Sequence, residues 1–193
     1  MNPALLSLPA AFGLAGAAGL NATLPLVIVS LLARLGLVHL APPFDALETD
    51  IAFYGLLVLA VIEFAVDKVP ALDSVGHAVM LPISAAAGSI LFASQTGAVD
   101  DMHPGVAVLV SVLAGGGVAA TVHTARASVR PVANLGLMGP PLSIVEDATS
   151  ALLAVAAALV PIVVPFLLVL LVVAAVLLWQ RRRAPRPPAM STR

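Results

Sequence analysis

Long apolar runs that almost lack charged residues set the strongest limit on what this chain can fold into. Between Pro3 and Pro42 the only charged residue is Arg34, and over all 193 residues 61% are hydrophobic and 10% are charged. A soluble domain carries roughly 25% charged residues, and a soluble fold of this size could not remove so much apolar surface from water. The sequence therefore predicts an all-α integral membrane protein, for which lipid is the solvent.

About six stretches are long and apolar enough to be transmembrane helices, since one crossing of the hydrocarbon takes about 20 residues. Several of these helices begin after polar cap residues. An example is the segment Asp101 to His103, which directly precedes Pro104 in the first turn of a predicted helix. A loop rich in Pro and Gly is predicted over 131–141, and Pro161 with Pro165 supplies the last turn. The predicted helices cover about 21–40, 50–67, 73–95, 104–127, 143–160 and 165–180.

The first 40 residues are too long for one crossing, and they contain a signal for a helix break. Gly19-Leu20-Asn21 combines a flexible glycine with a favoured N-cap residue. We therefore expect residues 3–20 to form an interfacial or re-entrant segment before the helix over 21–40. One long, tilted helix is the alternative.

Two prolines, Pro25 and Pro82, fall inside predicted helices, and they predict that the first and third helices are broken or bent. Each proline would free the carbonyl group four residues earlier, at Asn21 and Ala78. Such carbonyls bind ions in the broken helices of transporters, or they mark a simple bend. The string Gly-x4-Leu-Pro occurs at both places, over 19–25 and 76–82, which predicts that the helices form three related hairpins.

The basic residues predict the orientation in the membrane. With both termini in the cytoplasm, Lys68, Arg126, Arg130 and the five arginines of 181–193 lie inside, and only Arg34 lies outside. This distribution follows the positive-inside rule. We predict one membrane-embedded domain over 1–180 in the inner (cytoplasmic) membrane and a basic, Pro-rich cytoplasmic tail over 181–193.

Two acidic residues near the end of the helix over 50–67 are the strongest candidates for chemistry. Glu63 lies within the apolar part of this helix, and Asp67 follows four residues later, hence on the same face. A carboxylate at membrane depth costs about 2–3 kcal/mol or more and normally faces a cavity or a partner. Such a group can take up and release a proton or a cation. Alternatively, Asp67 pairs with Lys68 or an arginine, and Glu63 only bonds to a neighbouring helix.

Charged residues of the later helices could join this pair. Ser143-x-x-Glu146 reads as a capping box at the start of a helix. Asp147 either complements the dipole of that helix or forms a shared cluster with Glu63 and Asp67. Arg126 and Arg130 could neutralise these acids, bind lipid headgroups or set the topology.

The histidines give weaker signals. His123, between Thr121 and Thr124, makes an interhelical hydrogen bond or serves as a proton relay. His39 and His103 are expected at the interface or at helix caps. The sequence contains no HxxxH or HExxH motif and no cysteine, so neither a metal site nor another cofactor is expected.

Four strings share their order with a known family: Gly19-Leu-Asn-Ala-Thr-Leu-Pro25, Leu32-Ala-Arg34-Leu-Gly36, Glu63-Phe-x-x-Asp67-Lys68-Val-Pro-x-x-Asp73 and Ser143-x-x-Glu146-Asp147. Together they resemble, over roughly residues 10–180, the small bacterial membrane proteins known as domain of unknown function 4126. The resemblance implies a membrane location and importance for Glu63, Asp67, Lys68, Glu146 and Asp147, but no activity. After Asp73 the chain departs from the family pattern, because His77 and Leu81-Pro82 replace a further acid and an Arg-Pro pair.

The string from Glu63 to Lys68 is also similar to the Glu-x-Gly-Asp-Lys-Thr signature of a family of cation/proton exchangers. The spacing differs by one residue, and the Gly and Thr are missing. This likeness points to the chemistry of a paired acid and lysine in a membrane helix.

Two functions fit these features. The first is a secondary transporter or channel for a small ion or solute, in which Glu63 and Asp67 carry the proton or cation. The other candidate residues for this site are Lys68, Asp73, Glu146, Asp147, Asn21 and His123. The alternative is a non-transporting membrane scaffold or a lipid-interacting subunit. Membrane lipids are the expected partners, a homo-oligomer is an open alternative, and nucleic acid is not expected. An enzyme is not expected either, since the sequence offers no nucleophile–base pair.

Overall fold

The computed structural model describes residues 4–67, 73–95, 97–99, 102–135, 139–166, 169 and 173. These residues form an all-α fold. The β-type pairing among them is a single isolated antiparallel bridge between Leu40 and Gln95. The α-helices are α1 (Ala4–Leu20), α2 (Leu24–Arg34), α3 (Asp50–Asp67), α4 (Asp73–Ala93), α5 (Pro104–Val110), α6 (Gly117–Leu135) and α7 (Gly139–Leu159). Short helical segments are η1 (Phe44–Glu48), the π-helical η3 (Ser111–Gly116) between α5 and α6, and η4 (Pro161–Val163).

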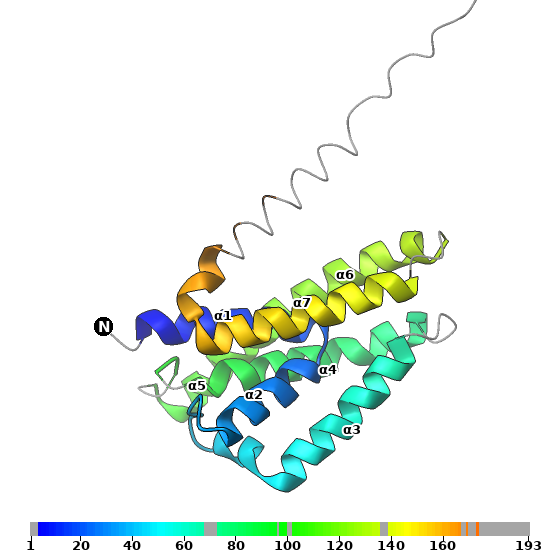
Figure 1. Cartoon of the computed structure of the whole chain (residues 1–193). Coiled ribbons are helices and arrows are strands. Elements are labelled where there is room, and N and C mark those ends of the chain that lie inside the picture. Colours follow the sequence, from blue (N-terminus) through cyan, green and yellow to red (C-terminus); the bar gives the residue numbers. More distant parts are fainter. Residues whose placement is uncertain are drawn as a thin grey trace, which may run out of the picture.

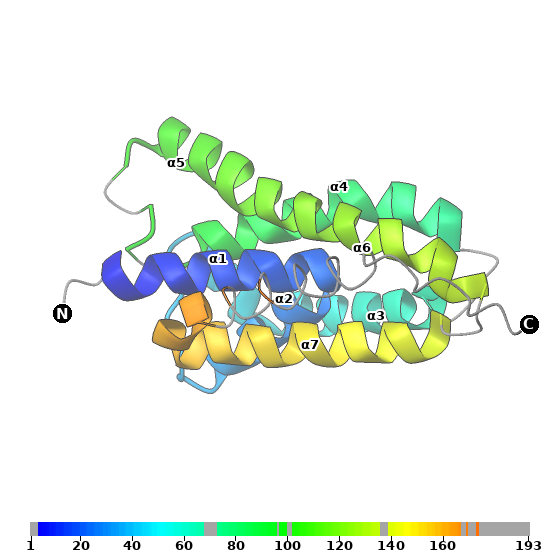
Figure 2. The ribbon, with the colours of Figure 1, turned by 90° about the horizontal axis from the view of Figure 1, so that it is seen from above.

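Helix α1 lies at the centre of the bundle, where it contacts α4, α6 and α7. In both views α4, α6 and α7 run along the length of the bundle, whereas α1 enters from the end that holds the N-terminus and stops before the far end (Figures 1 and 2). Helix α2 then turns back towards the N-terminal end. Residues 4–34 therefore form a helical hairpin whose turn lies inside the bundle.

The predicted break near Asn21 is confirmed, and the alternative of one long helix is wrong. Helix α2 is nevertheless shorter than the predicted helix over 21–40. Gly36 adopts a φ of 71°, and the N–H groups of Gly36 and Leu37 donate to the carbonyl oxygens of Ala33 and Leu32. This arrangement ends a helix. Pro25 lies in the first turn of α2, where its missing N–H costs nothing, so it does not free a mid-helix carbonyl as predicted.

The hairpin also bears on the predicted topology. Helices α1 and α2 have 17 and 11 residues, fewer than the roughly 20 of a full crossing. The start of α1 and the end of α2, which closes with Arg34, lie at the same end of the bundle (Figure 1). The sides of the membrane on which the termini lie stay a prediction. The predicted last helix and the tail over 181–193 lie largely or wholly outside the described residues.

Over 131–141 the prolines do not separate two helices by a long loop as predicted. The predicted loop over 131–141 is mostly helical, since α6 continues through Pro131 to Leu135 and α7 begins at Gly139. Pro140 and Pro141 occupy the first turn of α7, which tolerates proline. Helix α4 runs through Pro82 without interruption. The two Gly-x4-Leu-Pro strings therefore have different structures, one at a break and one within a helix.

Several boundaries agree with the sequence. Helix α3 has the predicted bounds, and α4 begins at Asp73 as expected. His103 caps α5, since its side chain accepts a hydrogen bond from the N–H of Gly105, and Pro104 follows in the first turn. The helix that starts there continues through a π-helical turn into α6.

The outer surface of the bundle is apolar, and the interior is built from small residues. Helix α3 shows this most clearly, because Glu63 is its only buried residue while large side chains such as Tyr54, Val58, Val61 and Phe64 are exposed. A water-soluble helix would have the opposite arrangement. Two helical stretches in the described part of the chain, Pro104–Ser128 and Pro141–Leu159, are long and apolar enough to cross a membrane. The fold is that of an all-α integral membrane protein.

Candidate functional site

Five ionisable side chains from α3, α6 and α7 gather around the break between α1 and α2. We call residues Leu20 to Thr23, which form this break, the hairpin tip. We call the five side chains the charge cluster: Glu63, Asp67, Arg126, Glu146 and Asp147. Arg126 lies about two and a half turns before the end of α6, and Asp147 about two turns after the start of α7. Arg126 and Asp147 therefore lie inside their helices, whereas Asp67 is the last residue of α3 and Glu63 lies one turn before it. The cluster joins these positions at the hairpin tip.

Glu63 binds the start of α2. Its carboxylate oxygens accept hydrogen bonds from the N–H of Ala22 at 2.9 Å, the N–H of Thr23 at 3.0 Å and the hydroxyl of Thr23 at 2.6 Å. The first N–H groups of a helix have no partner within the helix, and together they carry partial positive charge. Glu63 supplies the anion that such a helix end favours.

Arg126 binds the end of α1. Its guanidinium donates to the carbonyl oxygen of Leu20 and to Oδ2 of Asp67, the latter at 2.5 Å. Its Nε lies 2.9 Å from Oε2 of Glu146, an ionic contact without the angle of a hydrogen bond. Since the carbonyl end of a helix carries partial negative charge, each of the two helix ends at the tip faces a side chain of opposite charge.

Asn21 connects the tip to α7. Its side-chain amide donates to Oδ1 of Asp147 at 3.0 Å, and its side-chain oxygen accepts from the N–H of Leu24 at 2.8 Å. Thr23 holds the N-cap position of α2 but makes no side-chain cap bond. Asn21 thus supplies the cap that the sequence predicts, from a position further upstream.

These contacts bear on two predictions for the acids. Ser143 lies within α7 and is fully buried, so the predicted capping box with Glu146 is wrong. The reason is that the helix begins a turn earlier, at Gly139. Glu146 pairs with Arg126 instead. Asp147 lies at the same hairpin tip as Glu63 and Asp67, where each acid binds a different partner. A shared function of the three acids stays a prediction.

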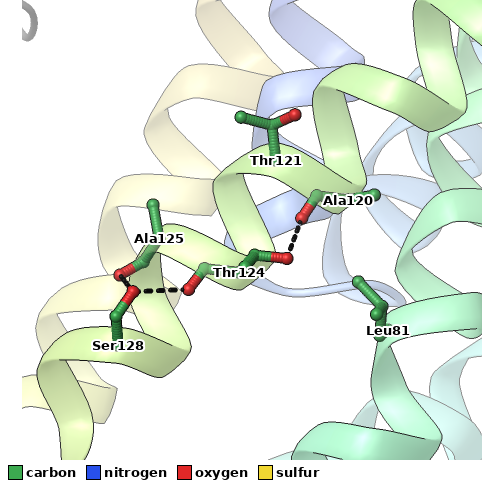
Figure 3. Close-up of a pocket in the computed structure, with 6 residues that line it drawn as sticks. All are labelled: Leu81, Ala120, Thr121, Thr124, Ala125 and Ser128. Atoms are coloured by element: carbon green, nitrogen blue, oxygen red, sulfur yellow. Dashed lines mark hydrogen bonds between the residues drawn. The ribbon is translucent and has the colours of Figure 1, made fainter.

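His123 faces inward, apart from the threonines that flank it in the sequence. It is buried, and its Nδ1 lies 3.3 Å from the hydroxyl of Ser84 in α4. Thr121 and Thr124 instead line a hollow on the outside of α4 and α6, and their hydroxyls donate to carbonyls of their own helix (Figure 3). The other residues of this hollow are Leu81, Ala120, Ala125 and Ser128. The interhelical hydrogen bond predicted for His123 is therefore the geometry observed.

The remaining predicted site residues cannot be placed in the cluster. Lys68 lies outside the described residues, and Asp73 opens α4 with a side chain that also lies outside them. Among the described side chains, no three His, Asp or Glu residues converge as the ligands of a metal ion would. The acids of the cluster instead face separate partners around the tip.

For Arg126 the sequence leaves three roles open: a counter-ion for the acids, a ligand for lipid headgroups and a determinant of topology. Its contacts with Asp67 and Glu146 correspond to the first. A signal was present, since His123 lies three residues earlier on the same face of α6, and both side chains are buried. A polar, buried face on α6 could have been inferred from that spacing.

Chemically, this arrangement joins two helix ends, three helices and several exchangeable protons at one place. Carboxylates that accept from main-chain N–H groups can release them when their charge is neutralised, and a guanidinium can exchange between carboxylate partners. The site thus offers groups able to hold a small charged species within an apolar bundle.

Comparison with known proteins supports one assignment. The family model described as domain of unknown function (DUF4126) matches residues 8–181, which covers the hairpin, the charge cluster and the long helices. No curated protein matches the chain, and no solved structure does. The family match confirms the resemblance seen in the ordered strings around Asn21, Glu63 and Glu146. The chain belongs to the DUF4126 family.

Proposed function

We propose that this protein moves a small ion or solute across a bacterial cytoplasmic membrane, and that the charge cluster is the place where the transported species binds. The observation that carries this proposal is the hairpin tip, where two helix ends meet ionisable side chains inside an apolar bundle. Broken helices whose ends meet at mid-bundle form the substrate and ion sites of many secondary transporters.

The cost of the cluster supports the proposal. Buried ionisable groups in a membrane bundle are costly even when they are paired, and apolar residues would pack there at lower cost. Helix α3 buries no residue other than Glu63, although its sequence offers many apolar side chains for that face. Because acids predominate among the described residues of the cluster, a cation, the proton included, is the favoured species.

The membrane setting completes the proposal. We place the end of the bundle at which α6 terminates, beyond Arg130, towards the cytoplasm, following the positive-inside rule. We place lipid against the exposed apolar face of α3. The hairpin then enters from the opposite side. Assembly of the protein into a homo-oligomer stays a prediction.

Flux measurements with a matched pair of variants test the proposal. Asp147→Asn removes a charge from the cluster and keeps the bond from Asn21, since an amide oxygen also accepts. Asp50→Asn removes a charge of the same kind from the exposed pair with Arg34, outside the cluster. In proteoliposomes we expect proton or alkali-cation flux with the wild type and Asp50→Asn. With Asp147→Asn we expect at least about a tenfold loss of flux, because the site loses a negative charge that would attract the cation, and tenfold corresponds to about 1.4 kcal/mol.

Two outcomes would contradict the proposal. One is a folded wild type that moves no ion of a broad panel, and the other is an Asp147→Asn variant with undiminished flux. The scaffold function is then the better interpretation, and one observation favours it. Glu63 accepts from three donors, and Arg126 contacts α1, α3 and α7, which would also suit a purely structural joint. In that case the cluster variants lose stability, and none of the proteins, wild type included, shows flux.

A further inference from the structure

We infer that the hairpin tip is a charge-held latch, and that the start of α2 swings away from the bundle when Glu63 loses its charge. The inference rests on the proposed function for the meaning of this opening, because the movement would expose the cluster. The movement itself can be measured without transport.

The two ends of α2 are held by different kinds of contact. At its far end, Gly36 and Leu37 close the helix with main-chain hydrogen bonds, and the hydroxyl of Ser30 donates to the carbonyl of Leu47 at 2.5 Å. Arg34 adds an exposed pair with Asp50. The bonds that close this end of α2 and tie it to η1 therefore persist when the charge at the tip changes.

At the tip the contacts are made by ionisable side chains. Glu63 of α3 and Arg126 of α6 bind the backbone of the tip, and Asp147 of α7 binds the side chain of Asn21. Hydrogen bonds to charged groups are roughly twice as strong as those between neutral groups. Ala22 adds only a methyl group to the apolar contact at this point, and so small a side chain contributes little burial. Loss of the Glu63 charge therefore removes a large part of what holds the tip.

Helix α1 cannot share the movement. A side-chain carbon at Gly19 would lie 2.6 Å from the carbonyl oxygen of Ala119 and 2.5 Å from Cβ of Val122. The backbones of α1 and α6 are thus in direct contact one residue before the tip. The chain is held up to Gly19 by this contact and again near Gly36 by the closing hydrogen bonds, and α2 from Pro25 to Ala33 packs in the core between them. The part that can move when the charge is lost is therefore the tip, which leads into the first turn of α2.

Neutralising Glu63 is the step that couples binding to opening. A cation bound by Glu63 would compete with the N–H groups of Ala22 and Thr23 for the same carboxylate oxygens. The charged neighbours on the described elements are Asp67, one turn further along α3, and Arg126 with Glu146 and Asp147 across the tip. Occupation of the site would in this way release the element that covers it.

Single-cysteine labelling tests the latch, and it is clean because the chain contains no cysteine. Ala22→Cys places a thiol at the tip, where the wild-type side chain has an exposed fraction of 0%. Ala154→Cys in the core of α7 and Leu37→Cys on the surface serve as the buried and exposed controls. The reagent is a membrane-impermeant maleimide, applied to the full chain in detergent micelles.

In combination with Glu63→Gln, we expect the thiol at position 22 to react at least about tenfold faster, which corresponds to the loss of a charged hydrogen bond. Thr23→Val removes one of the three donors to Glu63 and keeps the carboxylate, so it should give a smaller increase. The thiols at positions 154 and 37 should react at unchanged rates in all backgrounds.

Each possible labelling result either supports or overturns the latch. Faster labelling at position 22 in either background, with position 154 unchanged, supports the latch, and Thr23→Val alone is sufficient if Glu63→Gln does not fold. Unchanged labelling at position 22 with Thr23→Val, or equal acceleration at positions 22 and 154, overturns it. A tip that opens in a protein without ion flux keeps the latch and removes the transport function, whereas flux with a closed tip removes only the latch.

Discussion

Replacing Arg126 with alanine should lower the free energy of unfolding by roughly 3–5 kcal/mol, the range seen when one partner of a buried ion pair is removed. The guanidinium joins the end of α1 to Asp67 of α3 and Glu146 of α7. Its side chain is only 5% exposed, so water cannot replace it. Alanine would leave two carboxylates and a helix-end carbonyl without their cation in an apolar bundle. Reversible unfolding in mixed detergent micelles measures the change.

Arg34 is a matched control, because it makes the same kinds of contact in a more exposed place. It donates to the carbonyl of Glu48 and to Asp50, as Arg126 does to Leu20 and Asp67. Its side chain is 27% exposed and that of Asp50 is 75% exposed. Exposed pairs contribute about 0–1 kcal/mol, and the stacking on Phe53 adds a similar amount. We therefore expect Arg34→Ala to cost about 1–2 kcal/mol. Equal losses for the two variants would show that burial of the Arg126 contacts is not decisive.

The elements that local rules govern could be predicted from the sequence. The bounds of α3 follow from a polar start and an apolar run, and the break after Leu20 follows from Asn21 and its neighbours. The C-terminal end of α6 and the start of α7 could not be predicted in this way. Pro131 lies inside a helix that continues, and Pro140 lies at the start of the next, so the same residue type has two meanings that only packing separates.

For the candidate site, the sequence predicts which residues lie close together on one helix but not which partners they bind. Glu63 and Asp67 lie four residues apart on one helix, and both contact residues at the hairpin tip, directly or through Arg126, as their common face predicts. It could not predict that Glu63 binds main-chain N–H groups while Asp67 binds a guanidinium. Asn21 and Asp147 are separated by 126 residues, and no periodicity connects positions at that distance. Such pairings depend on how the hairpin enters the bundle.

Gly115→Ala should destabilise the bundle by roughly 1–3 kcal/mol or more, the usual cost of overpacking. A Cβ at this position would lie 2.5 Å from the carbonyl oxygen of Gly88 and 2.5 Å from Cβ of Phe92. Both are parts of α4 that cannot rotate away, because one is main chain and the other is the root of a fully buried aromatic side chain. The contact is the close helix approach that small residues permit in membrane proteins.

The two following glycines provide controls within the same turn. At Gly116 a Cβ would meet the hydroxyl of Ser89 at 2.6 Å and the carbonyl oxygen of Ala85 at 3.1 Å, so Gly116→Ala should cost less, since the hydroxyl can rotate. At Gly117 nothing lies within 4 Å. There alanine should be neutral or stabilising by up to about 1 kcal/mol, because it favours the helix more than glycine does. Unfolding of the three variants in the same micelles should rank them Gly115→Ala, Gly116→Ala and Gly117→Ala from least to most stable. A common loss at all three positions would mean that the flexibility of the glycine run matters, and that the contact between α4 and the π-helical turn does not.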